Sequence, residues 1–188
     1  MAGTSAAAQP PSRLPLALVL LCGTAVAACL GVYAKVHPAA LRPLFLAGFS
    51  GMLQLKTWLA TAALLLVLVQ VVTALWMWGR LPAAGPAASW VPSAHRWSGS
   101  VAFVLTLPVA LHCVWSLGFL TTTPRVLAHG LVGCAFYGAY AAKMLGLRLR
   151  GLPGWALPVL GGAVFALFVL LWATSALWFF TRSGVPLV

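Results

Sequence analysis

Long apolar runs separated by short polar segments dominate the pattern of this 188-residue chain. A hydrocarbon core about 30 Å thick takes roughly 20 apolar residues of helix to cross. Five runs reach that length, so the sequence predicts an all-α integral membrane protein built as a five-transmembrane-helix bundle. The runs form one transmembrane domain, residues 14–182, after a tail at 1–13 that we expect to be disordered. The expected spans are 14–34, 58–78, 98–120, 126–147 and 157–180.

The composition supports a lipid bilayer as the surrounding medium. Hydrophobic residues make up 63% of the chain and the mean hydropathy is +1.04. The chain has 11 Lys and Arg but no Asp or Glu, and the cations are spread over loops and helix ends. Nucleic-acid binding needs cations gathered on one soluble face, so it is excluded. Without carboxylates, acid–base chemistry by paired acids and proton transport through buried acids are excluded as well.

Charge placement predicts how the chain is oriented in a cell membrane as a multi-pass protein. We name the side that carries residues 35–57 the X side and the opposite side the Y side. Six cations against five favour a cytoplasmic Y side, and with it a cytoplasmic N-terminus. The Y side holds Arg13, Arg80, Arg96, Lys143, Arg148 and Arg150; the X side holds Lys35, Arg42, Lys56, Arg125 and Arg182. In an alternative, residues 26–29 form a lipoprotein processing site, which would leave four helices and a lipidated Cys29.

Three of the four histidines lie in the stretch 95–147, which reads as two apolar helices joined by the turn TTTPR. At 1.5 Å per helical residue, His112 lies about 12 Å and His129 about 6 Å from this X-side turn. Two imidazoles at similar depth on adjacent antiparallel helices predict the axial ligands of one haem b. The competing interpretation is a pair of hydrogen-bonded core histidines.

Small residues surround the predicted haem ligands. Gly133 lies one turn beyond His129, and Gly130, Cys134 and Gly138 recur every four residues. Small residues let a porphyrin or another helix approach closely, and for the stripe itself helix packing is the simpler interpretation. All four cysteines lie in predicted spans and are expected to be free thiols. The chain has no C-x-x-C-H motif, so covalently attached haem is excluded.

The segment HRWSGSVAFVLTLPVALH resembles the ligand helix of bacterial b-type cytochromes and ferric-reductase-like membrane domains. Such helices begin His-Arg/Lys-x-x-Gly, continue with x-x-Ala-x-x-Leu, and carry a second His about four turns later. The resemblance covers only residues 95–147, and it implies haem b and transmembrane electron transfer. Two departures matter. His95 and His112 are separated by sixteen residues instead of thirteen, and Lys143 stands where the second helix would carry its second His.

These departures favour one haem, held as His112–Fe–His129, with two haems as the alternative. A second haem at the Y side would combine His95 with Lys143, Met77 or Met144. His95 is otherwise a candidate for binding a quinone oxygen, and His37 is a further candidate ligand or a loop residue. No protein carboxylate is available to pair with the cations. Lys56 and Arg125 at the X boundary are therefore expected to bind haem propionates, with lipid headgroups or an acidic partner subunit as alternatives.

Two functions follow for testing. The first is a b-type cytochrome subunit that transfers electrons and exchanges them with quinol or with a redox partner protein. It is an electron-transfer subunit more than a self-contained oxidoreductase, since the loops are too short for a dinucleotide-binding domain. The second is a non-catalytic membrane scaffold or assembly subunit that binds no cofactor.

Overall fold

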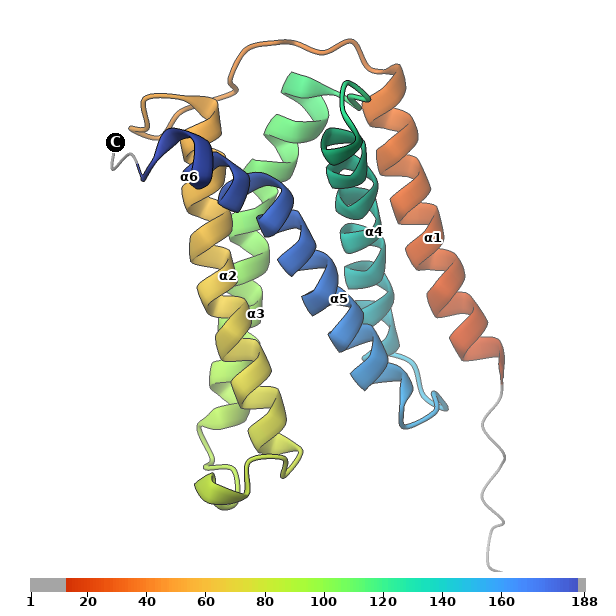
Figure 1. Cartoon of the computed structure of the whole chain (residues 1–188). Coiled ribbons are helices and arrows are strands. Elements are labelled where there is room, and N and C mark those ends of the chain that lie inside the picture. The colour runs from red at the N-terminus through yellow and green to blue at the C-terminus, as the bar shows by residue number, and fades with distance from the viewer. Residues whose placement is uncertain (1–12, 186–188) are drawn as a thin grey trace, which may run out of the picture.

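Helices account for all the regular secondary structure in the computed structural model, which describes residues 13–185 (Figure 1). The expected disordered tail falls outside the described residues, apart from Arg13, which begins the first helix. The long α-helices are α1 Arg13–Val36, α2 Met52–Met77, α3 Val91–Leu111, α4 Pro124–Gly146 and α5 Ala156–Trp172. The shorter elements are the 3₁₀-helix η1 Pro82–Ala84, the π-helices η2 His112–Leu117 and η3 Ala173–Leu177, and α6 Trp178–Ser183.

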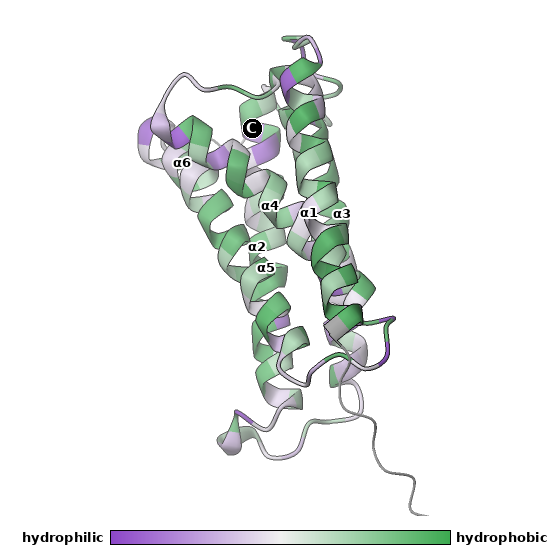
Figure 2. Cartoon of the chain, turned by 90° about the vertical axis from the view of Figure 1, so that its right-hand side faces the viewer, coloured by the Kyte–Doolittle hydropathy of each residue, from purple (hydrophilic) through white to green (hydrophobic). Residues whose placement is uncertain are grey.

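Four helical segments are long and apolar enough to cross a membrane. They are Leu14–Val36, Met52–Met77, Val91–Leu117 and Ala156–Ser183. The ribbons of these helices are coloured mostly as hydrophobic in Figure 2, and many of their large apolar side chains are exposed. The expectation of a helical membrane bundle is confirmed at this level, because outward-facing apolar helices are what a bilayer solvates.

Helix α4 is the exception among the long helices. It has 23 residues, yet it is not among the four segments apolar enough to span, and it carries Arg125, His129 and Lys143. Its main neighbours are α1 on one side and α5 on the other. Because protein covers these two sides, α4 has less need of an apolar surface than the helices that face lipid.

Two helices begin before the spans expected from the sequence. Helix α2 begins at Met52, ahead of the span expected from residue 58, and α3 begins at Val91, ahead of the span expected from residue 98. Hydrophobicity marks the stretch that hydrocarbon can solvate, whereas a helix continues until its backbone bonds end. Lys56 and His95 therefore lie within helices, where their side chains can face neighbouring helices.

The X ends of α3 and α5 each widen into a π-helix. Pro108 lies inside α3 and has no backbone N–H to donate, and η2 follows it at His112. In α5 the π-helix η3 contains Thr174. π-Turns often occur at functional positions, and here both carry polar side chains that become part of the candidate site.

The bundle is built from pairs of helices that pack along their lengths. The extensive interfaces are α2 with α3, α1 with α4, and α4 with α5. Consecutive helices α3 and α4 do not form such an interface; instead their aromatic side chains meet. Phe103 stacks on Tyr140 with ring centroids 4.1 Å apart, and the Tyr137 hydroxyl donates a 3.0 Å hydrogen bond to the Thr106 carbonyl. Helices α3 and α4 are therefore adjacent through these side chains, whereas their most extensive interfaces are with other helices.

The stripe of small residues on α4 packs against α1. A Cβ atom on Gly138 would lie 2.5 Å from the Gly23 carbonyl oxygen, and one on Gly23 would lie 2.7 Å from the Gly138 oxygen. Cys134 faces Gly31, and Gly130 faces the Phe119 ring. The helix-packing interpretation of this stripe is thus the correct one, because backbones this close leave no room for side chains.

Cysteine placement agrees with the expectation of free thiols, with one difference. All four cysteines are free; Cys22, Cys113 and Cys134 are half-buried, whereas Cys29 is exposed on the outer face of α1. An exposed thiol within a membrane span meets lipid, which tolerates a small apolar group.

Candidate functional site

His129 has a fixed orientation at the X end of the bundle. Its Nδ1 lies 2.9 Å from the Thr174 Oγ1, and that hydroxyl donates its one hydrogen to the Leu170 carbonyl at 2.7 Å. Thr174 must therefore accept from His129, so Nδ1 carries the proton. The neutral imidazole then has a free lone pair on Nε2, the form in which histidine binds a metal.

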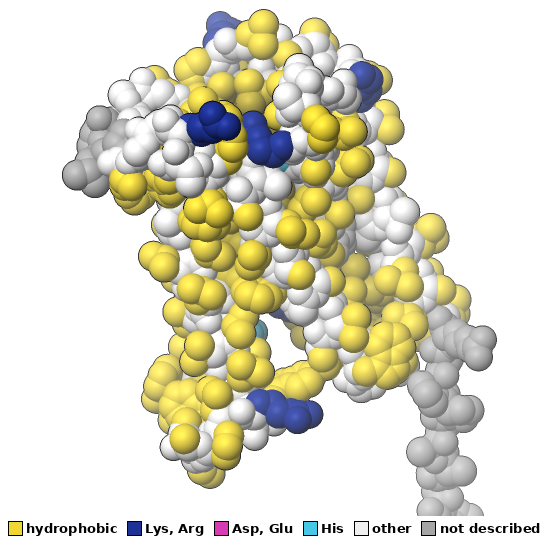
Figure 3. Space-filling model, viewed as in Figure 1, with side chains coloured by type: hydrophobic (Ala, Val, Ile, Leu, Met, Phe, Trp, Pro, Cys, Tyr) yellow, Lys and Arg dark blue, Asp and Glu magenta, His cyan; other side chains and the backbone are white. Residues whose placement is uncertain are grey.

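Two cations lie near the same imidazole. The Arg125 guanidinium donates from Nη1 to the Thr174 carbonyl at 2.6 Å and lies 3.9 Å from the centre of the Trp178 ring. Lys56 places its Nζ 3.6 Å from the Cys113 Sγ. Both charges act electrostatically on His129. Lys and Arg side chains gather near the upper end of the face in Figure 3, and the chain contains no acidic residue to neutralise them.

His112 is fully buried at the start of η2 and holds the connector between α1 and α2. Its Nδ1 lies 2.8 Å from the Pro108 carbonyl oxygen, and its Nε2 lies 3.1 Å from the Phe45 carbonyl oxygen and 3.2 Å from the Leu44 backbone nitrogen. With the proton on Nδ1, His112 donates to Pro108 and accepts from Leu44; with the proton on Nε2, it donates to Phe45. The Phe45 ring packs edge-on, with its centre 5.0 Å from that of the imidazole. The imidazole replaces a missing backbone partner for a segment that has no regular structure.

The predicted ligand pair is not in direct contact. Within residues 13–185, no hydrogen bond or ring contact joins His112 to His129, and no cluster of three metal-ligating side chains occurs. His37 lies on the connector, with its ring 5.0 Å from that of Tyr33 and 6.2 Å from that of Trp115. Its buried Nδ1 has no hydrogen-bond partner. Ligation of one iron by His112 and His129 stays a prediction.

A second polar site lies at the Y end, between α2 and α3. His95 Nδ1 lies 2.9 Å from the Thr73 Oγ1, and Thr73 donates to the Val69 carbonyl at 2.7 Å. The Gln70 amide donates to the His95 carbonyl and, at 2.8 Å, to the Ser98 hydroxyl.

Lys143 of α4 acts electrostatically on His95. The closer pairing of these two residues that the spacing indicates stays a prediction. Figure 3 shows the lower part of the molecule open between the α2–α3 pair and α5, with histidine and Lys or Arg atoms at the edge of this opening.

The two histidine–threonine contacts share one local design. In each, Nδ1 donates to a threonine on the neighbouring helix, and that threonine donates to the carbonyl four residues earlier. In each set, a glycine lies four residues after the histidine on the same helix. This glycine faces the residue that lies three positions before the threonine on the partner helix. The corresponding residues are His95, Gly99, Thr73 and Gln70 in one set, and His129, Gly133, Thr174 and Leu171 in the other.

The two sets have opposite orientations in the bundle. Helix α2 ends and α3 begins at the Y end, whereas α5 ends and α4 begins at the X end. The chain order also differs: the threonine helix precedes the histidine helix in the first pair and follows it in the second, so the two pairs are not repeats of one unit. No repeat of 20–50 residues is evident in the sequence, because the two pairs share little beyond His-x-x-x-Gly and a threonine near the end of the partner helix.

Sequence reasoning missed both threonines, Thr73 and Thr174. A threonine in an apolar helix usually satisfies its own hydroxyl on the preceding turn, so it attracts no notice by itself. The available signal was its position near the end of the helix that packs beside each histidine. Gly133 is in place as expected, and a Cβ there would meet only Leu171, at an ordinary 3.7 Å. Protein packing therefore does not require this glycine.

The fold and these sites define a class: a helical, multi-pass membrane protein with a histidine–threonine site near each end of its bundle. The chain belongs to a family of unknown function, DUF6529, whose model matches residues 16–187. Comparison with curated proteins finds no match. Comparison with solved structures finds none either.

Proposed function

We propose that this protein is a b-type cytochrome subunit of the cell membrane, with five spans and a cytoplasmic N-terminus. In this proposal, four helices, α2 to α5, form the haem-binding core, and α1 packs on it from outside. The observation that carries the proposal is the fixed His129 imidazole, whose Nε2 is free and which lies beside two cations without acidic partners. A bound haem b would supply reversible one-electron chemistry at its iron.

The donor set fits an iron ligand. His129 directs its Nδ1 proton to an oxygen, which leaves Nε2 as the atom that would ligate iron; His112 would do the same in the tautomer that donates from Nδ1 to the Pro108 carbonyl. A hydrogen bond from the second nitrogen orients a ligating imidazole and increases its basicity. Thr174 performs this role for His129 from η3, and the Pro108 carbonyl performs it for His112 from α3.

His112 can take part only if its contact with the connector changes. Its Nε2 now accepts the Leu44 N–H, and an atom that ligates iron cannot also accept this bond. Leu44 is in an exposed turn segment without regular structure, so its N–H can turn to water or lipid headgroups at small cost. The proposed ligand pair thus couples haem binding to release of residues 44–45.

Arg125 and Lys56 are suited to bind two propionates. Arg125 is held in place by the Thr174 carbonyl and the Trp178 ring, and its remaining N–H groups can bind a carboxylate. The Lys56 amine has only a weak sulfur acceptor at Cys113. Gly133 leaves open surface one turn from the ligating histidine, as close approach of a flat macrocycle requires.

The surroundings suggest how electrons would enter and leave. The X-side loops are basic, so an acidic redox protein would meet them faster than a neutral one. Quinol in the bilayer is the other source of electrons, and His95 with Lys143 at the Y end is the place where a quinone oxygen could bind. The same pair would complete a second haem site if the chain holds two haems.

The alternative function is a scaffold or assembly subunit without a cofactor. One observation favours it: every hydrogen-bonding atom of His112 is satisfied by the protein, and its role in docking residues 44–45 is structural. In that case His129 and Thr174 would serve only to hold α4 against η3.

The absorption spectrum of the detergent-purified protein, reduced minus oxidised, decides between these functions. We expect a sharp α band and, by pyridine haemochrome assay, one haem b per chain. His112→Ala and His129→Ala should each abolish the band, whereas His37→Ala should retain it. Loss of the band in His95→Ala but not in His112→Ala would move the site to the Y end. Absence of haem after expression with ample haem would leave the scaffold function.

A further inference from the structure

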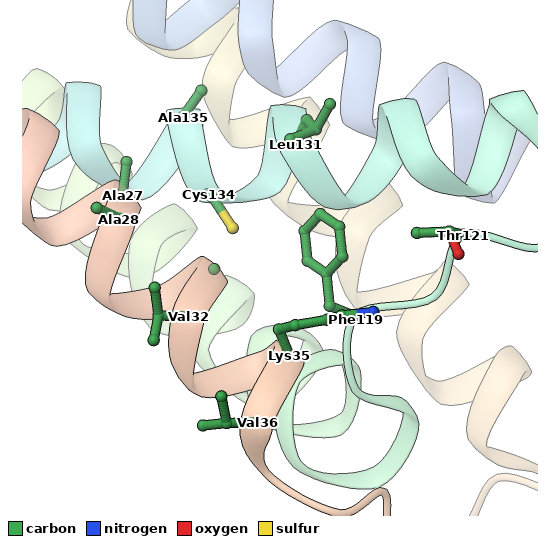
Figure 4. A pocket seen from close by; sticks show the side chains of 11 residues that line it. Ala27, Ala28, Val32, Lys35, Val36, Phe119, Thr121, Leu131, Cys134 and Ala135 are labelled. Atoms are coloured by element: carbon green, nitrogen blue, oxygen red, sulfur yellow. The ribbon is translucent and has the colours of Figure 1, made fainter.

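A groove opens between α1 and α4 on the X half of the molecule, and no histidine is among the residues that line it. Its volume is about 620 Å³ (Figure 4). The lining residues are Ala27, Ala28, Gly31, Val32, Lys35 and Val36 of α1, Phe119 and Thr121 of the η2–α4 loop, and Leu131, Cys134 and Ala135 of α4. We call this the α1–α4 groove. Its size lies within the range of ligand-binding clefts.

The close crossing of α1 and α4 explains why the groove exists. The two backbones touch at Gly23 and Gly138, and straight helices that cross this closely must diverge on either side. Toward the X end the separation is bridged only in part by Phe119. Its backbone N–H donates to the Ala34 carbonyl at 2.8 Å, and its ring packs on Gly130. The rest of the space stays open to the outer surface.

The chemistry of the groove is almost entirely apolar, with polar groups only near its X end. Lys35 is in the last turn of α1, and Thr121 is in the loop between η2 and α4. Both therefore lie at the X end of the helices, at the membrane boundary. In Figure 4 the Lys35 side chain extends across the groove toward Phe119, with Thr121 beyond it. The Lys35 amine has no hydrogen bond or ion pair to any of the residues 13–185, and the chain has no acidic side chain to supply one.

We propose that the α1–α4 groove binds one acyl chain of an anionic glycerophospholipid, whose phosphate is held by the Lys35 amine and the Thr121 hydroxyl. The apolar lining of the groove suits a hydrocarbon chain that runs along the helices. The cation at the boundary matches a phosphate that carries net negative charge. A zwitterionic lipid offers the same chain but no net charge, so the groove distinguishes lipids by headgroup. This site does not depend on haem binding.

Lipid retention in detergent tests the proposal. The protein, purified and equilibrated with equal amounts of phosphatidylglycerol and phosphatidylcholine of identical chains, is examined by native mass spectrometry. We expect one phosphatidylglycerol per chain and a preference of about fivefold, the size of one Lys–anionic lipid contact. Lys35→Gln should abolish the preference. Arg42→Gln is the matched control: Arg42 lies on the X side over Trp115, 5.9 Å from its ring centre, and outside the groove lining.

A second pair of variants tests the chain-binding part. Gly31→Leu would fill the groove, because a Cβ at Gly31 already lies 3.6 Å from the Cys134 sulfur. This variant should lose both lipids, whereas Val104→Leu, an enlargement on the exposed face of α3, should retain them. If Gly31→Leu does not fold, the unchanged protein can be photo-crosslinked to phosphatidylglycerol that carries a diazirine in its acyl chain. Crosslinks should then fall on residues 27–36 and 131–135.

Five results would overturn the proposal. Equal losses in Lys35→Gln and Arg42→Gln would mean general attraction to a basic surface. Equal retention of both phospholipids would mean that the groove does not select lipids by headgroup charge. Crosslinks confined to other helices, or a protein partner copurifying at the groove in place of lipid, would mean that another ligand covers it. Glycerol phosphate without chains should not compete; competition by it would show a phosphate site without an acyl-chain site.

Discussion

The His129 Nδ1 and the Thr174 Oγ1 lie 2.9 Å apart and join α4 to the π-helical end of α5, 45 residues further along the chain. The threonine hydroxyl donates to its own helix, so the histidine must donate to the threonine. A single side-chain contact therefore selects the imidazole tautomer and also connects two helices. The predictions below begin with this contact.

Thr174→Val should destabilise the protein by about 1–3 kcal/mol, because a largely buried N–H donor loses its acceptor without a change in side-chain volume. The free energy of unfolding in mixed detergent micelles measures this effect. Thr174→Ser keeps the hydroxyl and is the control. If haem binds at His129, Thr174→Val should also weaken haem affinity by about 10–100-fold. If stability and haem content were both unchanged, the hydrogen bond between His129 and Thr174 would not orient the imidazole.

Gly138→Ala should be far more harmful than Gly133→Ala. A Cβ at Gly138 would lie 2.5 Å from a backbone oxygen of Gly23, so α1 must move away, whereas a Cβ at Gly133 meets only Leu171 at 3.7 Å. We expect a loss of about 1–3 kcal/mol for the first change and little for the second. Thermal unfolding of both variants in one detergent gives the comparison. Equal stability of the two would contradict the close α1–α4 crossing.

The haem content of Gly133→Ala tests the candidate cofactor site separately. Since protein packing does not require this glycine, a fully stable variant with reduced haem would place the macrocycle beside it. Full haem content in the stable variant would place the cofactor elsewhere.

The exchange rate of the Leu44 backbone amide reports on His112. In the described structure this amide donates to His112 Nε2 at 3.2 Å. His112→Ala should therefore speed its hydrogen–deuterium exchange, measured by mass spectrometry on peptides that cover 41–46. Haem-replete protein should show the same acceleration, because iron would occupy Nε2. Slow exchange in haem-replete protein would exclude His112 as the ligand and leave its role as support for the connector.

Gln70→Leu should weaken the α2–α3 interface. The Gln70 amide donates to the His95 carbonyl and to the Ser98 hydroxyl, and Leu171 occupies the equivalent place in the other helix pair. Interhelical hydrogen bonds in membranes contribute about 0.6 kcal/mol on average, so we expect a loss near that size. Gln54→Leu is the control, since Gln54 bonds only to Ser50 one turn earlier. Detergent unfolding of both variants makes the measurement, and a stabilised Gln70→Leu would contradict this account.

Helix type and the approximate position of each helix could be predicted, whereas the helix starts at Met52 and Val91 could not. Apolar runs report the length that lipid solvates, and the polar first turns of α2 and α3 continue beyond it. The pairing of His95 with Lys143, inferred from counting residues along two antiparallel helices, stays a prediction. The sequence also did not determine that α3 packs most extensively on α2 and α4 on α1, because loop length does not determine which helix faces which.

The sequence by itself determined the apolar helices that suit a bilayer, the lack of acidic side chains and the helix on which each of His95, His112 and His129 lies, since these depend on local composition and on the period of a helix. Only the tertiary structure decided what each imidazole contacts. Thr174 meets His129, Thr73 meets His95, and Leu44 meets His112 across separations of 45, 22 and 68 residues. Such contacts depend on how helices rotate and cross, and in this bundle the crossing of α1 and α4 is set by glycine backbones in direct contact, which no hydrophobic pattern encodes.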